Sequence, residues 1–129
     1  MSPVITALYA GLLGIVYLVL AGFVVSNRRR ARVGLGTGSD TALERAVRVH
    51  GNFAEYVPLF LVLLLVAELG GGPAVLLHVI GAAFVLARLA HAFGLSQSSG
   101  TSGGRFGGTL VTWVAILGLA LLNIALALG

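Results

Sequence analysis

Four polar residues in the middle of the chain have types that could recognise a small charged molecule. They are Arg48, Asn52, Glu55 and Tyr56. Their spacing of i, i+4, i+7 and i+8 would place all four on one face of a helix. Residues 60–66, which follow directly, are all apolar and belong in lipid. Charged groups at such a position persist only when they pair with one another or with a ligand. Two interpretations stay open: a structural ion-pair cluster between helices, and, which we favour, a binding site for a small zwitterion.

Further polar residues interrupt a second apolar stretch. Arg88 and His91 are neighbours at i, i+3 near the end of the predicted third segment. These residues and the second segment predict a polar pocket at one edge of the membrane, closed by the ends of the first and fourth segments. One four-helix unit has little interior for so many polar groups, so we expect shelter between the subunits of an oligomer.

Composition places the chain in a membrane. Of 129 residues, 58% are hydrophobic and only 9% are charged, and the mean hydropathy is +1.05. No soluble domain of this size can bury that much apolar surface. The absence of cysteine excludes disulfides and a Cys nucleophile. No His or carboxylate spacing predicts a metal site.

Four apolar segments, at about 4–26, 41–69, 74–94 and 106–128, are each close to the length that crosses a bilayer. The predicted fold is therefore an all-α, integral membrane four-helix bundle, with residues 1–129 as a single domain. Ser39 or Asp40 is the expected N-cap of the second segment. The third segment is expected to end at Gly94. The glycine- and serine-rich stretch 96–104 is expected to be a flexible loop. Pro58 is expected to bend the second helix.

The basic residues predict how the helices are oriented. The net charge is +4, and every arginine flanks the first or the third connection, whereas the second connection and both termini have none. The positive-inside rule then places connections one and three in the cytoplasm and both termini outside. We therefore interpret the positive charge as orientation in the inner or cell membrane of a bacterium, in contact with membrane lipid, and expect no nucleic-acid partner.

The second segment resembles the signature of a known family. The matching residues are Arg48-x-x-x-Asn52-x-x-Glu55-Tyr56-x-Pro58-Leu59. They resemble the signature of the MAPEG family, the membrane-associated proteins in eicosanoid and glutathione metabolism. The segment order, the basic first connection and Ala-Arg-Leu at 87–89 extend the resemblance, to a bacterial-type member, over nearly the whole chain. It implies a homotrimer that binds glutathione, as co-substrate, between protomers. Many members transfer glutathione to a lipophilic small-molecule substrate or reduce hydroperoxides, and one branch binds lipid without catalysis.

The resemblance also implies roles for individual residues. Those expected to line the glutathione site are Arg28, Arg48, His50, Asn52, Glu55, Tyr56, Arg88 and His91. Arg105 matches the arginine thought to activate the thiol, although the loop before it varies in length within the family. Leu95 departs from the pattern, because glutathione-using members usually have a tyrosine there.

Residue chemistry agrees with such a ligand. Arginines suit the two carboxylates of glutathione, Glu55 suits its ammonium group, and a cation such as Arg105 would favour the thiolate. Two alternatives to a glutathione transferase or peroxidase remain. One is a non-catalytic lipid-binding or scaffold protein of the same fold, favoured by Leu95. The other, less favoured, is a small multidrug-type transporter, which would be expected to have a carboxylate in its first helix. We expect His78 to be a hydrogen-bonded packing residue or an interfacial one. Trp113 and Tyr17 are expected to be membrane-packing or interface aromatics.

Overall fold

The computed structural model of the chain, which describes residues 2–97, 100 and 102–129, is a bundle of four helices. These are α1 (Val4–Ala31), α2 (Thr41–Leu69), α3 (Ala74–Gln97) and α4 (Gly103–Leu128). Each is long and apolar enough to cross a membrane. The predicted all-α membrane bundle is therefore confirmed. Of the loop predicted at 96–104, residues 98, 99 and 101 lie outside the described residues.

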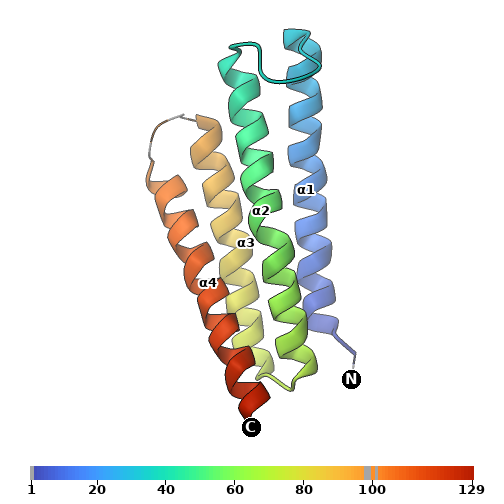
Figure 1. Cartoon of the computed structure of the whole chain (residues 1–129), viewed down its shortest axis with the longest axis vertical. Coiled ribbons are helices and arrows are strands. Elements are labelled where there is room, and N and C mark those ends of the chain that lie inside the picture. Colours follow the sequence, from blue (N-terminus) through green and yellow to red (C-terminus); the bar gives the residue numbers. More distant parts are fainter. Residues whose placement is uncertain (1, 98–99, 101) are drawn as a thin grey trace.

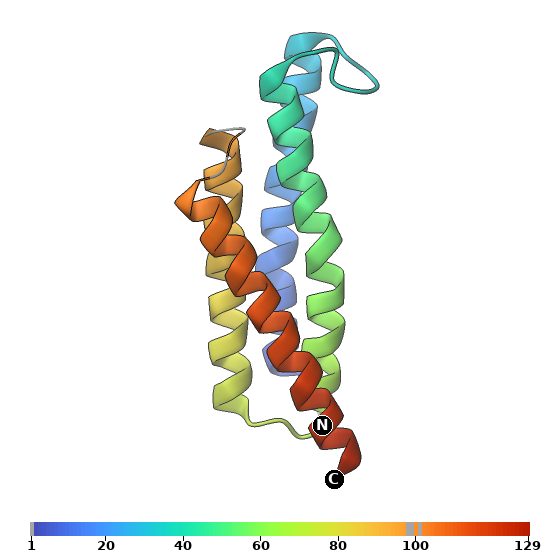
Figure 2. The ribbon, with the colours of Figure 1, turned by 60° about the vertical axis from the view of Figure 1, so that its left-hand side comes forward.

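The helices lie side by side with α2 and α3 between the outer two (Figure 1). Helix α1 packs mainly on α2, while α4 packs on α3 and also contacts α2. At the end that carries the α1–α2 connection, α1 and α2 extend beyond α3 and α4, as Figure 2 shows from a second side. The first turns of α2 therefore stand clear of the other two helices.

Local sequence explains where the helices begin. Asp40, one of the two predicted caps, accepts a hydrogen bond from the backbone N–H of Leu43 at 2.8 Å, so it is the N-cap of α2. Ser102 caps α4 in the same way, its hydroxyl oxygen accepting from the N–H of Arg105 at 3.2 Å. Helix α4 thus begins three residues before the predicted start at 106.

Two helices end later than predicted. Helix α1 continues past 26 through three arginines to Ala31, because basic side chains are favourable in a last helical turn. It closes at Arg32, which has a left-handed backbone with φ of 56°. Helix α3 continues past Gly94, the predicted end. A Cβ atom at Gly94 would lie 2.6 Å from the backbone nitrogen of Arg105, so this glycine permits close approach of α4 instead of ending α3.

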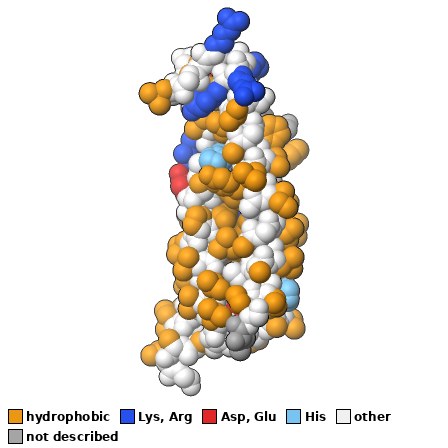
Figure 3. Space-filling view, turned by 90° about the vertical axis from the view of Figure 1, so that its right-hand side faces the viewer, with side chains coloured by type: hydrophobic (Ala, Val, Ile, Leu, Met, Phe, Trp, Pro, Cys, Tyr) orange, Lys and Arg blue, Asp and Glu red, His pale blue; other side chains and the backbone are white. Residues whose placement is uncertain are grey.

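The core is made of large apolar side chains between the helices. At its centre the rings of Phe60 and Phe84 stack with their centroids 3.6 Å apart. Most other large apolar side chains point outward, such as Leu18, Val75 and Phe93. In Figure 3 such side chains cover most of the length of the bundle, and the arginines gather at one end. This distribution is the reverse of a soluble protein and fits a chain surrounded by lipid.

At the opposite end, Glu68 of α2 is buried beside the first turn of α1. Its two carboxylate oxygens accept hydrogen bonds from the backbone N–H groups of Ile5 and Thr6, at 2.8 and 2.7 Å. These are groups that the first turn of a helix leaves without partners. Nearby, the hydroxyl of Tyr9 donates to the backbone carbonyl of His78 at 2.9 Å. The same hydroxyl lies 3.2 Å from Nδ1 of His78, whose side chain is exposed, so His78 has a hydrogen-bond partner but is not packed in the core.

Candidate functional site

Arg88 of α3 is the centre of a polar cluster inside the bundle. Its side chain is only 1% exposed. One terminal guanidinium nitrogen donates to the hydroxyl of Thr112 on α4 at 3.3 Å, and the other donates to the amide oxygen of Asn52 on α2. The Nε–H group is buried and has no hydrogen-bond partner among the described residues. Arg88 is therefore held by two neighbouring helices, and one of its three nitrogens has no partner among the described residues.

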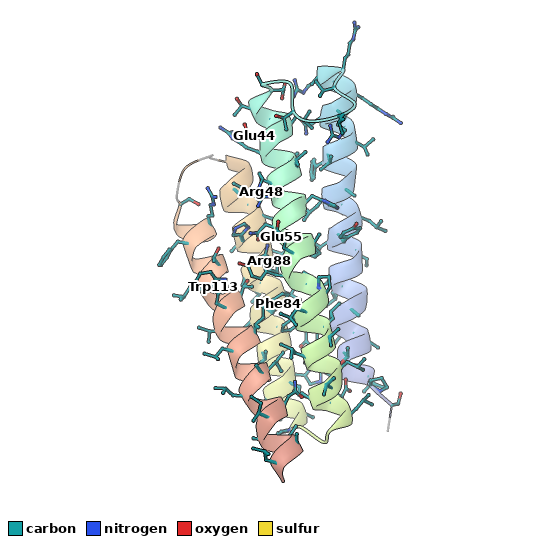
Figure 4. The ribbon with its side chains drawn as sticks, viewed as in Figure 1. Glu44, Arg48, Glu55, Phe84, Arg88 and Trp113 are labelled. Atoms are coloured by element: carbon teal, nitrogen blue, oxygen red, sulfur yellow. The ribbon has the colours of Figure 1, made fainter. Side chains whose placement is uncertain are left out.

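Tyr56 lies against this guanidinium group. The carbon at the centre of the Arg88 guanidinium is 5.5 Å from the centroid of the Tyr56 ring, within range of a cation–π interaction. The Tyr56 hydroxyl oxygen accepts a hydrogen bond from the indole N–H of Trp113 on α4 at 3.0 Å. We call Asn52, Tyr56, Arg88, Thr112 and Trp113 the polar cluster; Figure 4 shows Arg88 and Trp113 close to the same level of the bundle.

Arg48 and Glu55 lie on the same side of α2 but face outward (Figure 4). The closest distance between the Arg48 guanidinium and the Glu55 carboxylate is 3.6 Å, and their side chains are 55% and 56% exposed. In a soluble protein such a pair would be unremarkable and contribute little. On a membrane helix, exposed surface faces lipid or another subunit, and neither charge is stable against lipid.

His91 and Arg105 extend the polar cluster towards the α3–α4 connection. His91 is buried, and its Nδ1 atom has no partner among the described residues. The guanidinium of Arg105 donates to the carbonyl of Gly100 at 3.2 Å. Because the Arg105 backbone lies against Gly94, six residues after Arg88, the two arginines stand roughly 9 Å apart along the bundle.

Close packing of α3 on α4 fixes this arrangement. A Cβ atom at Gly108 would lie 2.5 Å from the carbonyl oxygen of Ala87 and 2.7 Å from the Cβ of His91, so no larger residue fits. One turn away, a Cβ at Gly104 would lie 2.9 Å from the carbonyl oxygen of Ala90. Small residues spaced by four are typical of membrane helices whose backbones touch. The position of Arg105 relative to Arg88 is therefore set by backbone contact.

Arg28 and His50, two of the predicted site residues, contact other parts of the subunit. Arg28 donates to the carbonyls of Val33 and Gly36, at 3.3 and 2.8 Å, and so closes the α1–α2 connection. His50 points towards α1, where its ring packs on Tyr17 with the centroids 4.8 Å apart. Any joint action of these residues with Arg88 would require a neighbouring subunit.

Sequence reasoning missed Thr112 and overlooked the role of Trp113. A signal was present, because both are residues able to form hydrogen bonds in a segment that is otherwise rich in Leu, Ala and Val. Leu95, where a tyrosine was expected, is buried at 6% exposure in the apolar core and supplies no hydroxyl.

An apolar groove adjoins this end of the bundle. It encloses about 460 Å³ between α1, α2 and α3, and its lining includes Leu20, Phe23, Val49 and Ala92, with Arg45 as a charged member. A groove of this size is in the range that holds small molecules. The polar cluster and a lipophilic groove therefore lie in neighbouring parts of one membrane-embedded bundle.

Comparison with known proteins identifies the family of the chain. The MAPEG family model matches residues 6–125. The chain is 33% identical over 120 residues to "Inner membrane protein YecN" of Escherichia coli strain K12. The aligned region covers 93% of this chain and 90% of the relative. The same protein from Escherichia coli O6:H1 strain CFT073 matches equally. The chain is therefore a multi-pass membrane protein that belongs to the MAPEG family.

Proposed function

We propose that this protein binds glutathione and transfers it to lipophilic electrophiles, or uses it to reduce lipophilic hydroperoxides. The proposal rests on family membership together with one observation: Arg88 is buried and ordered on two sides, and yet its Nε–H is unused. A buried donor without a partner is costly, and it is a position where an anionic ligand group would be stabilised.

The residues around Arg88 have the chemistry that glutathione needs. Arg88 and Arg48 would bind carboxylates, for which arginine is well shaped. Glu55 would bind the ammonium group, and the Asn52 amide can both donate and accept. Arg105 stands about two helical turns from Arg88, and its positive charge would lower the pKa of a thiol and so favour the nucleophilic thiolate.

Assembly and orientation are part of the proposal. Arg48 and Glu55 are more than half exposed in one subunit, so a homotrimer with the ligand between subunits would remove them from lipid. The same arrangement could bring Arg28 and His50 of one subunit towards the polar cluster of the next. We propose the inner membrane as location, with the α1–α2 and α3–α4 connections cytoplasmic and the termini external, because all arginines lie near those two connections.

A non-catalytic lipid-binding role in the same fold is the second candidate. Two observations favour it: Leu95 supplies no hydroxyl, and the Arg105 guanidinium already donates to the carbonyl of Gly100. The apolar groove could then hold a lipid with no thiol chemistry. Family membership gives no support to a small multidrug-type transporter.

A titration of the purified protein with glutathione in mild detergent tests the binding proposal. We expect saturable binding that weakens by about 10-fold or more in Arg48→Ala and in Glu55→Ala, the loss expected for a charge-assisted hydrogen bond. Glu44→Ala, an exposed carboxylate in the first turn of the same helix, is the matched control and should bind as wild type. Equal binding by all four proteins would contradict the proposed site, and absence of binding by wild type would contradict the function.

Turnover separates the two candidates. With a chlorodinitrobenzene as electrophile, a transferase forms the conjugate in proportion to bound glutathione. Saturated protein that forms no conjugate and reduces no hydroperoxide would favour the lipid-binding role. Native mass spectrometry of the same sample tests the trimer, and a ligand-binding monomer would contradict a site shared between subunits.

A further inference from the structure

Trp113 lies well inside α4 in sequence, and more than half of the residue is exposed on the surface of the bundle. It follows Arg105 by eight residues, so it stands roughly 12 Å further along α4 than the basic edge of the bundle. Interfacial tryptophans belong at the headgroup level, with the indole N–H in contact with water or headgroups. Here the N–H donates instead to the hydroxyl oxygen of Tyr56 on α2, at 3.0 Å.

This hydrogen bond has a definite direction. An indole N–H can only donate, so the Tyr56 oxygen must be the acceptor. The phenolic proton of Tyr56 must then point away from Trp113, and it has no acceptor among the described residues. The Tyr56 ring cannot turn freely either, because it lies against the guanidinium of Arg88. Trp113 therefore determines where the hydroxyl proton points.

Side chains of helix α4 hold both Arg88 and Tyr56 in place. Thr112 accepts from Arg88 at 3.3 Å and, through its own hydroxyl proton, donates to the carbonyl of Gly108 at 2.7 Å. The next residue, Trp113, orders Tyr56. Two consecutive residues of α4 thus orient a guanidinium on α3 and a phenol on α2. The Nε–H of the guanidinium and the O–H of the phenol have no acceptor among the described residues.

We propose that Trp113 is a positioning residue, which fixes the Tyr56 hydroxyl proton as a hydrogen-bond donor to an anionic group of the bound ligand. The inference rests on the proposed function for the identity of that ligand, glutathione. The Trp113–Tyr56 hydrogen bond itself is independent of it. Trp113 does not touch the ligand in this account, and it acts only through Tyr56.

Emission of the ligand-free protein tests the hydrogen bond, because Trp113 is the single tryptophan of the chain. Tyr56→Phe removes the acceptor and keeps the ring, so the indole emission should shift to shorter wavelength. Tyr17→Phe, a tyrosine that packs on His50 and has no part in the polar cluster, is the matched control and should leave the emission unchanged. An unchanged spectrum in Tyr56→Phe would overturn the proposal whether or not glutathione binds.

A double-mutant cycle tests the positioning role. Trp113→Phe keeps an aromatic ring, although a smaller one, and removes the N–H. We expect glutathione affinity to fall by about 2- to 10-fold, the range for one neutral hydrogen bond. In a Tyr56→Phe background the same substitution should have no further effect. Independent, multiplicative losses would overturn the proposal, as would full affinity in Trp113→Phe. If wild type binds no glutathione, the proposed function fails, and the emission test alone decides the Trp113–Tyr56 pairing.

Discussion

Two buried charges, Glu68 and Arg88, lie at different levels of the same bundle and are treated differently by their surroundings. Both oxygens of Glu68 accept backbone hydrogen bonds from the first turn of α1. Arg88 has two nitrogens bound to side chains of other helices and a third without a partner among the described residues. A buried charge whose bonding capacity is used by backbone serves the fold. A buried charge that is held by side chains and keeps an unpaired N–H is suited to bind a ligand.

Removing the Glu68 carboxylate should have the largest effect on stability. In Glu68→Ala two N–H groups of α1 become buried without acceptors, which costs about 2–6 kcal/mol of unfolding free energy at about 1–3 kcal/mol per group. Thermal unfolding followed by circular dichroism in detergent measures the loss. Glutathione affinity of the folded protein should stay at the wild-type value. A Glu68→Ala protein that unfolds as wild type would show that the carboxylate does not fix α1.

Replacing Arg88 should have the opposite result. Arg88→Met keeps a long apolar side chain and removes the charge, so glutathione binding should weaken by about 2–4 kcal/mol. Stability should change less than in Glu68→Ala, because the desolvation cost of the buried charge disappears together with the hydrogen bonds to Asn52 and Thr112. Calorimetric titration and the same unfolding assay measure the two effects. Loss of folding with retained affinity would reverse the roles assigned to Glu68 and Arg88.

A small pH effect should come from neither of these charges but from the α1–α2 connection. A hydrogen bond from Arg30, at 2.6 Å, lowers the pKa of Asp40 below its usual value. Because the folded-state pKa is the lower one, the stabilisation is complete above about pH 4 and is lost as the pH falls through the folded-state pKa. Asp40→Asn retains an N-cap side chain but loses the ion pair with Arg30, so it should lower the melting temperature slightly at neutral pH and remove the acid dependence. A wild-type acid dependence that persists in Asp40→Asn would assign it to another group.

The sequence predicted the elements of this fold well, because apolar runs and their breaks are local properties. The four helices, the Asp40 cap and the shared face of Arg48 and Glu55 all follow from spacing along one segment. Helix ends were less accurate where tertiary contact decides them. Gly94 predicts a helix end by itself, but in the bundle it is the point where α4 touches α3.

The contents of the site could be predicted only in part. Residue types and the family resemblance indicated Asn52, Tyr56 and Arg88, and the structure brings them together. Their partners on α4 depend on how the helices pack, which no single segment specifies. The cap role of Glu68 likewise depends on a helix more than sixty residues away. Arg28 and His50 lie apart from Arg88 in one subunit, so their roles remain predictions about the assembly.

The ultraviolet absorbance of bound glutathione tests the central claim most directly, because a thiolate absorbs where a thiol does not. Near pH 7 free glutathione is largely protonated, with a thiol pKa around 8.5. We expect wild-type protein to produce a saturable thiolate band. In Arg105→Ala the band should fall, together with an about tenfold or greater drop in turnover, while glutathione affinity changes little. Saturable glutathione binding with no thiolate band in the wild-type protein would contradict catalysis and favour the lipid-binding role. No binding at all would return the polar face of α2 to a structural cluster.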